Sequence, residues 1–412
     1  MKYGLIGEHL GHSYSREIHE QIADYTYELK ELAPDEVAPF LRAREFAAIN
    51  VTIPYKQTVM PFLDEIDAHA QAIGAVNTVV NRDGKLYGYN TDFLGVKAQL
   101  ETMGLSLAGK KVMILGSGGT SQTARAVAKS LGAREIVTVS RTKTPETVTY
   151  EEALNAHTDA QILFNCTPVG MFPRDDASPI TLDAFGALEG VFDAIYHPLH
   201  TDLVQQAQKR NIPASGGLYM LSAQAVYASA LFLGKTATEE KIEKAYRAVK
   251  QQKSNVVLIG MPASGKSTVG KKLAHILNRP FYDTDTLIEE RIGMTIAEFF
   301  AQNGEQAFRA IEKDVIAGLS QNGGAVIATG GGAILDQDNV RRLKHNGTLF
   351  FLDRDLASLR ATKSRPLSSD PEKLKKLYEI RMPLYRAAAD VRIISQKTPG
   401  KTAQLILKEW ET

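Results

Sequence analysis

The chain has 412 residues, of which 44% are hydrophobic and 23% charged, and its formal net charge is +1 at pH 7. This length predicts two or three domains of about 150 residues each, and the near-neutral charge without a basic run disfavours nucleic-acid binding. We expect no membrane segment, because no apolar stretch approaches the ~20 residues of a span. The N-terminus turns polar too early for a signal peptide, and the single cysteine, Cys166, excludes internal disulfides. These features predict a cytoplasmic protein.

The first hundred residues alternate short strands with polar loops. Strands are predicted over residues 2–7 and 48–53, with a helix over 18–25 between them. Pro54 would end the second strand, so Thr52 and Lys56 are expected at its C-terminal edge, where open α/β sheets bind ligands. Asn77 and Asp92 follow in the segments GAVNT and GYNTD. Together these polar residues predict a site for a polyhydroxylated small molecule, although each alone is also typical of a turn.

A second unit, beginning near Gly109, has the pattern of a dinucleotide-binding fold. A strand over 112–115 opens into the turn GSGGTS, in which Ser121 replaces the third glycine of G-x-G-x-x-G. A helix and a second strand follow, and that strand ends in SRTK. NAD-binding proteins usually have an acidic residue at this strand end, whereas Arg141 with Lys143 suits the 2′-phosphate of NADP. A solvated basic turn is the alternative.

Three features near the end of the first half are interpreted as structural. We interpret Cys166 as a small packed residue, because the sequence offers no obvious base that would activate its thiol. Residues 239–252 carry apolar side chains at i, i+3, i+4 and i+7, which predicts a helix. The polar residues 251–255 are predicted to form a short linker.

The segment NVVLIGMPASGKSTVG, at residues 255–270, matches G-x-x-x-x-G-K-[ST] at every fixed position. An apolar strand is predicted over 256–259, directly before the motif, and a helical pattern over 269–277 follows it. The glycines allow backbone N–H groups to surround a phosphate, Lys266 adds a charge for the β- and γ-oxygens, and Ser267 offers a hydroxyl to Mg²⁺. This context favours a nucleotide-binding loop over a chance run of glycine and serine.

Two carboxylates and a run of glycines follow in this last third of the chain. Asp283 and Asp285 are predicted at one strand end, where period-two geometry points both side chains to the same side. One can organise Mg²⁺ or take a proton while the other binds substrate hydroxyls. The glycines at 330–332 follow another predicted strand and allow a ligand to approach the backbone closely.

The chain up to about residue 250 resembles shikimate dehydrogenase, through HSYS, NVTIPYK, GAVNT, GYNTD, GSGG, SRT, NCTPVGM and GGLYMLSAQA in that order. The resemblance implies that Lys56 and Asp92 are the catalytic pair. The substrate-binding residues that it implies are Ser13, Ser15, Thr52, Asn77, Asp92, Tyr196 and Gln224. The NADP-binding residues that it implies are Gly116, Ser117, Gly118, Gly119, Thr120, Ser140, Arg141, Thr142, Lys143 and Gly217.

Residues 254–412 resemble shikimate kinase, through GMPASGKST, DTD, FR, GGG, RPL and RMPLY. The resemblance implies that Lys266 and Asp283 are catalytic and that Ser267 and Asp283 hold Mg²⁺. The ATP-binding residues that it implies are Ala263, Ser264, Gly265, Lys266, Ser267, Thr268, Arg360, Arg365 and Lys397. The shikimate-binding residues that it implies are Asp285, Arg309, Gly330, Gly331, Gly332 and Arg381. For any one of these arginines, a solvated helix surface is the alternative.

The sequence therefore predicts an α/β protein with an N-terminal substrate domain, a Rossmann-like NADP domain and a P-loop domain like that of nucleoside monophosphate kinases. The predicted ranges are 1–100, completed by helices at about 218–252, then 101–235 and 254–412. The resemblances imply a bifunctional enzyme that reduces 3-dehydroshikimate with NADPH and phosphorylates the 3-hydroxyl of shikimate with ATP and Mg²⁺. One alternative is a quinate/shikimate dehydrogenase that uses NAD and is fused to a different small-molecule kinase. The other is a nucleotide-sensing scaffold. The expected partners are small molecules, and the sequence does not predict an oligomeric state.

Overall fold

A computed structural model provides the structure of the protein. It describes residues 1–11, 13–359 and 371–411. The predicted ATP-binding residues Arg360 and Arg365 lie outside these described residues.

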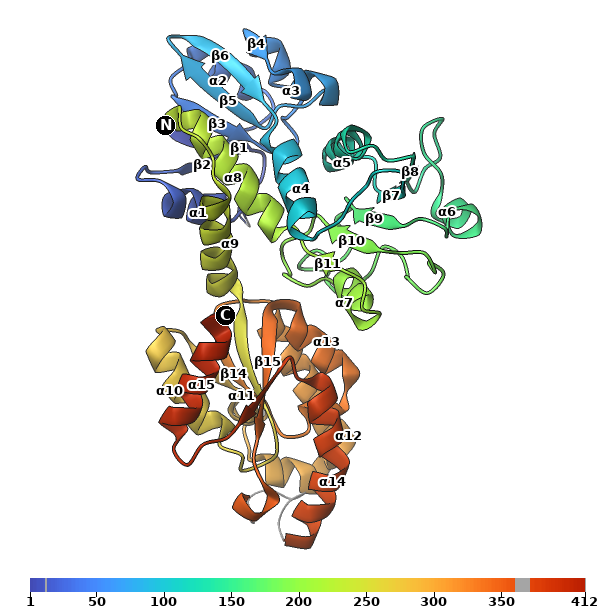
Figure 1. Cartoon of the computed structure of the whole chain (residues 1–412). Helices are drawn as coiled ribbons and strands as arrows, with labels where there is room; N and C mark the ends of the chain where they lie inside the picture. Colours follow the sequence, from blue (N-terminus) through green and yellow to red (C-terminus); the bar gives the residue numbers. More distant parts are fainter. Residues whose placement is uncertain (12, 360–370, 412) are drawn as a thin grey trace. The chain divides into compact units, whose positions relative to one another are not determined.

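The chain divides into two compact units, Met1–Lys250 and Gln251–Thr412. Within the described residues, the first unit contains one mixed and one parallel sheet, and the second contains a single parallel sheet (Figure 1). This arrangement confirms the predicted α/β class. Among the described residues, no helix has both the length and the apolar character needed to cross a membrane.

The mixed sheet of the first unit has the strand order β2-β1-β3-β5-β6-β4. Strand β1 pairs in parallel with β2 and β3, whereas β5 pairs antiparallel with β3 and β6. The elements are β1 (Tyr3–Gly7), α1 (Ser15–Ile22), β2 (Glu28–Glu31), α2 (Val37–Ala43), β3 (Ala48–Val51), a 3₁₀ turn (Met60–Phe62), β4 (Glu65–Ile66), α3 (Ala68–Ile73), β5 (Thr78–Arg82), β6 (Lys85–Tyr89) and α4 (Thr91–Thr102).

Strand β3 ends at Val51, two residues earlier than predicted. The chain turns there through a cis peptide bond between Ile53 and Pro54, and the N–H of Tyr55 donates to the carbonyl of Thr52 over 2.9 Å. Since proline has no N–H for strand pairing, this turn is where the ladder stops.

The parallel sheet of the first unit has the order β11-β10-β9-β7-β8. Along β7, Val112 and Ile114 pack into one buried cluster and Met113 and Leu115 into another, so helices or loops cover both faces. The elements are β7 (Lys111–Leu115), α5 (Gly119–Ser130), β8 (Glu135–Val139), α6 (Tyr150–Ala156), β9 (Ile162–Asn165), β10 (Gly190–Asp193), α7 (Asp202–Lys209), β11 (Ala214–Ser215), α8 (Leu218–Leu233) and α9 (Glu239–Lys253).

Helix α8 packs closely on α4 in the first unit. A Cβ on Gly95 would lie 2.7 Å from the carbonyl oxygen of Met220, so this crossing requires a glycine. Helix α9 buries Ile242, Ala245 and Val249 in the cluster that also contains residues of α1 and α8. These three residues are spaced as the sequence predicted for one helix face.

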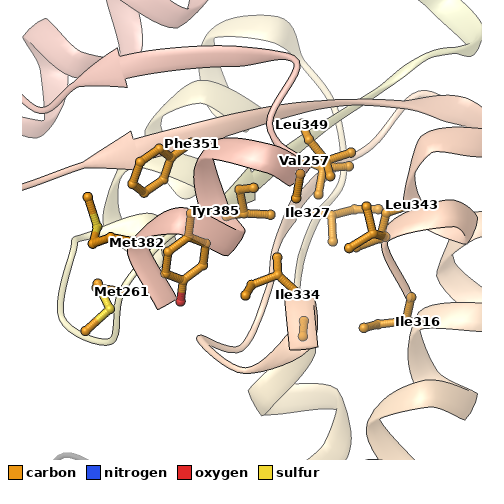
Figure 2. Close-up of a cluster of buried hydrophobic side chains, with 14 of the residues drawn as sticks. Val257, Met261, Ile316, Ile327, Ile334, Leu343, Leu349, Phe351, Met382 and Tyr385 are labelled. Atoms are coloured by element: carbon orange, nitrogen blue, oxygen red, sulfur yellow. The ribbon is translucent and has the colours of Figure 1, made fainter. Parts of the chain in front are cut away.

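The second unit is a parallel sheet with the order β13-β14-β12-β15-β16. On one face Val257, Ile327 and Phe351 pack against Met382 and Tyr385 of α14 (Figure 2). The elements are β12 (Asn255–Ile259), α10 (Lys266–Leu277), β13 (Phe281–Asp283), α11 (Thr284–Ile292), α12 (Ile296–Ser320), β14 (Val326–Ala328), a 3₁₀ turn (Ala333–Leu335), α13 (Gln337–Asn346), β15 (Gly347–Asp353), a 3₁₀ turn (Leu356–Ser358), α14 (Pro371–Ala388), β16 (Val391–Ile394) and α15 (Pro399–Glu411).

The predicted linker at residues 251–255 is wrong, because α9 continues to Lys253 and β12 begins at Asn255. Glutamine and lysine are good helix formers, and the last carbonyls of the helix find partners. The guanidinium of Arg279 donates to the carbonyl of Ser254 over 2.9 Å and also to that of Gln251. A single residue therefore separates the helix from the strand.

Gly323 offers a test of this junction, because a Cβ there would lie 1.7 Å from the carbonyl oxygen of Lys253. We expect Gly323→Ala to destabilise the second unit by about 1–3 kcal/mol, since the backbone must shift to relieve the overlap. The only tryptophan, Trp410, packs in the core of this unit, so its fluorescence during urea unfolding reports on the second unit.

The matched control is Gly318→Ala on α12, where a Cβ would meet no atom within 4 Å. This change should be neutral or stabilise the helix by up to about 1 kcal/mol. Equal unfolding midpoints for the two variants would contradict the close contact at Gly323.

Candidate active sites

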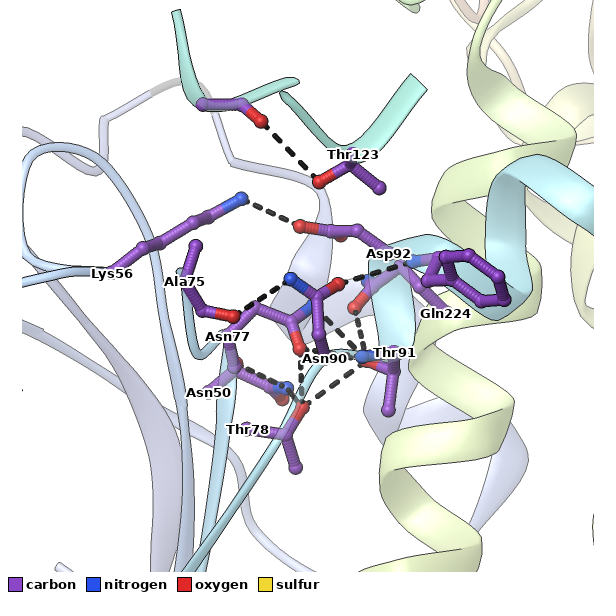
Figure 3. A network of polar contacts seen from close by, with 12 residues as sticks. Asn50, Lys56, Ala75, Asn77, Thr78, Asn90, Thr91, Asp92, Thr123 and Gln224 are labelled. Carbon is purple, nitrogen blue, oxygen red and sulfur yellow. Dashed lines mark hydrogen bonds and ion pairs between the residues drawn. The ribbon is translucent and has the colours of Figure 1, made fainter. Parts of the chain in front are cut away.

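Lys56 and Asp92 form an ion pair in the first unit. The ammonium of Lys56 lies 2.6 Å from Oδ2 of Asp92, and their side chains are 20% and 14% exposed (Figure 3). Lys56 follows the cis-Pro54 turn, whereas Asp92 lies in the first turn of α4, which the side chain of Asn90 caps by accepting from the N–H of Phe93. The pair thus joins two segments that each end a strand, and it remains accessible to a ligand.

Asn77 is at the centre of a buried polar network beside this pair. Its Oδ1 accepts from the N–H of Thr91 over 2.7 Å, and its Nδ2 donates to the hydroxyl of Thr91 over 3.0 Å (Figure 3). Thr91 also donates to Oε1 of Gln224 over 3.4 Å, and Asn50 donates to the hydroxyl of Thr78. The structure therefore brings Asn77 and Gln224 together next to Asp92, and it fixes the start of α4.

Ser13, Ser15 and Tyr196 form a second group of predicted substrate residues. The two serine hydroxyls lie 3.0 Å apart at the start of α1. The ring of Tyr196 packs 5.1 Å from that of Tyr14, whose hydroxyl lies 2.5 Å from Nδ1 of His197. Burial raises the pKa of Tyr196, which keeps its phenol protonated as a hydrogen-bond donor. Thr52 lies directly after β3, beside Gly7.

The turn between β7 and α5 has the backbone that a dinucleotide requires. Gly116 has φ +105°, and a Cβ there would lie 3.1 Å from the carbonyl of Cys166, so only glycine fits. At Gly118 and Gly119 a Cβ would meet nothing within 4 Å, which leaves room for a pyrophosphate against the start of α5. A Cβ on Gly217, which precedes α8, would lie 2.3 Å from the carbonyl oxygen of Ala194. The glycines of the turn thus leave the space that the pyrophosphate of NADP would need, whereas Gly217 is required by its contact with Ala194.

The basic residues after β8 differ in their surroundings. Arg141 is exposed, whereas Lys143 forms an ion pair with Glu152 on α6. Ser140 stands where an acidic residue would bind the 2′-hydroxyl of NAD.

Desolvation raises the pKa of the Cys166 thiol, which disfavours the thiolate that a nucleophile would need.

A cavity of about 680 Å³ opens above the sheet of the second unit. It is lined by the phosphate-binding loop, by both predicted aspartates, by residues of α12 and α14 and by the segment that follows β14. The predicted residues in its lining are Ala263, Gly265, Lys266, Ser267, Thr268, Asp283, Asp285, Arg309, Gly330, Gly331, Gly332 and Arg381. Ser264 is buried within the loop, and Lys397 lies on the exposed segment after β16.

The phosphate-binding loop holds its lysine inward. Ala263 and Gly265 have φ of +64° and +94°, and the ammonium of Lys266 donates to the carbonyls of Gly260 and Met261 over 2.8 and 3.0 Å. Helix α10 begins at Lys266, so its N-terminal N–H groups face the same loop. This arrangement concentrates positive charge where a triphosphate would bind.

The prediction that Asp283 and Asp285 both lie at the end of one strand is wrong for Asp285. Strand β13 ends at Asp283, which caps α11, and Asp285 already lies in the helix with its N–H 3.1 Å from Oδ1 of Asp283. Both still line the cavity. The hydroxyl of Ser267 lies 2.5 Å from Oδ2 of Asp283, so two hard oxygen ligands suited to Mg²⁺ are adjacent.

Arg309 and Arg381 approach the glycine run from two helices. Arg381 donates to the carbonyl of Gly331 over 2.9 Å. The guanidinium of Arg309 packs on Gly332, where an added Cβ would lie 2.3 Å from it, and it donates to Glu312 over 2.7 Å. Glycine is thus needed at 332 so that the arginine can lie against the backbone.

The sequence reasoning missed Glu312 and Arg354. Glu312 is 1% exposed, and burial raises its pKa while Arg309 opposes that rise. Its Oε1 faces Gly330 and has no hydrogen-bond partner among the described residues. The available signal was its position three residues after Arg309, the spacing of a helical ion pair. Arg354 follows β15 and lines the cavity beside Gly265.

The fold and its sites define a dinucleotide-dependent dehydrogenase unit and a P-loop kinase unit in one chain. The family model for the shikimate dehydrogenase substrate binding domain matches residues 5–79, and the shikimate kinase model matches residues 262–411. The chain belongs to the shikimate dehydrogenase family and carries a shikimate kinase domain, which makes it a bifunctional enzyme of the shikimate pathway. NADP is the dehydrogenase cofactor, and the kinase family implies ATP.

Individual relatives cover the dehydrogenase half. The chain is 33% identical over 269 residues to the shikimate dehydrogenase (NADP(+)) of Methanosphaera stadtmanae, covering 58% of this chain and 94% of that protein. It is 38% identical over 260 residues to that of Halothermothrix orenii, with 56% and 90% covered. The crystal structure of shikimate 5-dehydrogenase from Thermus thermophilus with NADP(H) and shikimate is 28% identical, with a TM-score of 0.54 over 60% of this chain and 99% of that one.

The ion pair between Arg309 and Glu312 generates a prediction for the kinase. In Glu312→Gln the guanidinium keeps a hydrogen-bond acceptor but loses its buried counter-charge. We expect the KM for the phosphoryl acceptor to rise about tenfold, because Arg309 is held less firmly without the buried counter-charge, while the KM for ATP changes little. Steady-state kinetics with each substrate varied would measure both.

Glu305→Gln is the matched control, because Glu305 pairs with the same arginine but is 49% exposed. Exposed ion pairs contribute little, so this variant should behave like the wild type. An equal loss in both variants would contradict the special role of the buried carboxylate.

Proposed function

We propose that the dehydrogenase half reduces 3-dehydroshikimate to shikimate with NADPH, and that the kinase half phosphorylates the 3-hydroxyl of shikimate with ATP and Mg²⁺. The observation that carries the first step is the accessible pair of Lys56 and Asp92 at 2.6 Å. The second is supported by Lys266, Asp283 and Asp285 lining one cavity. The single cysteine supports the cytoplasm as the place of action.

In the dehydrogenase, NADPH supplies the hydride. Reduction of a ketone leaves negative charge on its oxygen, which needs a proton. Lys56 can donate that proton and stabilise the oxygen while Asp92 orients the ammonium, and the neutral amine then takes a new proton from water. In the reverse reaction the neutral amine of Lys56 takes the proton of the alcohol. The amide of Asn77, held by Thr91, is suited to bind a ring hydroxyl, and the serines at the start of α1 are suited to the carboxylate.

In the kinase, Mg²⁺ would neutralise charge on the phosphates, with Ser267 and Asp283 as its ligands. Lys266 can exchange its two loop carbonyls for phosphate oxygens, since both are acceptors for the same ammonium. Asp285 is suited to orient the acceptor hydroxyls, and Arg309 with Arg381 to bind a carboxylate. We also retain, as part of this proposal, the predicted domain ranges 1–100, 101–235 and 254–412.

Substitution of the two lysines should separate the activities. We expect Lys56→Ala to lower kcat of the dehydrogenase at least about 100-fold, because the proton donor is lost. Lys266→Ala should lower kcat of the kinase by a similar factor of about 100 or more, because charge on the phosphates is no longer stabilised. Each variant should keep the other activity within about twofold, because the two sites share no residue.

Lys56→Arg distinguishes a proton donor from a structural ion pair. Arginine keeps the charge and can still bind Asp92, but it does not release a proton at ordinary pH. We expect this variant to fold normally and to reduce the ketone poorly. Full dehydrogenase activity in Lys56→Arg would show that the pair is structural.

A single reaction with 3-dehydroshikimate, NADPH and Mg-ATP tests the whole proposal. Formation of shikimate 3-phosphate together with oxidation of NADPH is the expected result. Oxidation of NADPH without phosphate transfer, or a preference for NAD and quinate when the dehydrogenase is assayed in the oxidation direction, would point to the alternative substrate choice.

A further inference from the structure

We propose that Arg125 of the dehydrogenase half is a specificity-determining residue that binds the 2′-phosphate of NADP, and that Glu146 is the carboxylate which this phosphate displaces. The inference rests on NADP as the cofactor of this half. It adds residues outside the SRTK segment, which alone had been expected to recognise the phosphate.

The first observation is a cavity of about 370 Å³ beside the Gly-rich turn. One wall is formed by Ser117 of the Gly-rich turn with Ser121 and Arg125 of α5, and the other by Thr138 of β8 with the loop over 144–147. Helix α5 and strand β8 lie next to one another in the first unit (Figure 1). In a dinucleotide-binding fold, the space between the end of the second strand and this turn is where the adenosine ribose binds.

The second observation is an unsatisfied hydroxyl in that cavity. Ser121 is 1% exposed, and its Oγ has no hydrogen-bond partner within residues 1–11, 13–359 and 371–411. Ser121 occupies the position of the third glycine in the fingerprint. A buried hydroxyl without a partner costs free energy unless a ligand satisfies it, so the cavity is built to receive a polar group.

The third observation is the charge at the cavity. Arg125 lies one helical turn after Ser121 on the same face of α5. Its Nη1 lies 3.0 Å from Oε2 of Glu146, and the two side chains are 42% and 72% exposed. An ion pair this exposed contributes little stability, whereas a phosphate dianion can bind the planar guanidinium through two hydrogen bonds. The phosphate can therefore replace the carboxylate at little cost.

Glu146 is held at the cavity by its own loop. The N–H of Thr144 donates to the hydroxyl of Thr147 over 3.0 Å, and that hydroxyl donates to the carbonyl of Thr142 over 3.1 Å. The carboxylate therefore stays near the cavity after it is displaced. Repulsion between two anions then lowers the affinity for NADP below what Arg125 alone would give.

The test compares binding of NADPH and NADH to the full chain, followed by the fluorescence of the reduced nicotinamide. Arg125→Gln should weaken NADPH binding about tenfold and leave NADH binding within about twofold, because only NADPH carries the 2′-phosphate. Glu146→Gln should tighten NADPH binding about twofold to fivefold, because it removes the competing anion. Displacement of NADPH by adenosine 2′,5′-bisphosphate, compared with 5′-AMP, reports only on this site even if the P-loop also binds these nucleotides.

Arg134→Gln is the matched control, since Arg134 is an exposed arginine between α5 and β8. It should leave both affinities unchanged. If Arg125→Gln weakens NADPH and NADH equally, or has no effect, the inference is overturned while the dehydrogenase assignment stands. Weaker NADPH binding in Glu146→Gln would likewise show that the ion pair only holds the loop. Failure of the wild type to bind NADPH would instead remove the proposed function together with this inference.

Discussion

Parallel strand pairing is the constraint on which both units depend. Because parallel strands all end at the same edge of a sheet, side chains that are far apart in sequence become neighbours there. The Gly-rich turn after β7 arises in this way, and so do the phosphate-binding loop after β12, Asp283 after β13 and the glycine run after β14. In the mixed sheet, Thr52 after β3 lies at such an edge. The chemistry is supplied by short segments, and the sheets determine where those segments meet.

Buried hydrogen bonds then hold the charged groups in each site. Asn77, the residue before β5, is hydrogen-bonded to Thr91 at the start of α4, and thereby determines where Asp92 lies. In the other unit Glu312 has the corresponding role for Arg309. In both cases an almost fully buried side chain, the neutral Asn77 or the oppositely charged Glu312, orients a charged side chain that a ligand can reach. Such an arrangement keeps the reactive charge preorganised while leaving it accessible.

The sequence predicted the fold class and the segments with fixed spacing, because glycines, prolines and apolar runs act locally. It could not predict contacts that depend on how helices cross the sheet. Glu312 looked like any helical glutamate until the structure showed it buried. Asp285 was expected on a strand, but the capping side chain of Asp283 starts a helix one residue earlier. The polar stretch after Val249 was interpreted as a linker, although its residues favour a helix as much as a loop.

The passage from α9 to β12 through the single residue Ser254 has a practical consequence. Helix α9 contributes Ile242, Ala245 and Val249 to the core of the dehydrogenase, whereas the carbonyl of Gln251 in its last turn accepts from Arg279 of the kinase. One helix therefore serves both halves. If the gene is divided before α9, the dehydrogenase fragment loses a core helix. If it is divided after α9, the kinase fragment loses the helical turn that precedes its central strand, β12. Independent expression of the halves calls for overlapping boundaries, with both fragments retaining the helix.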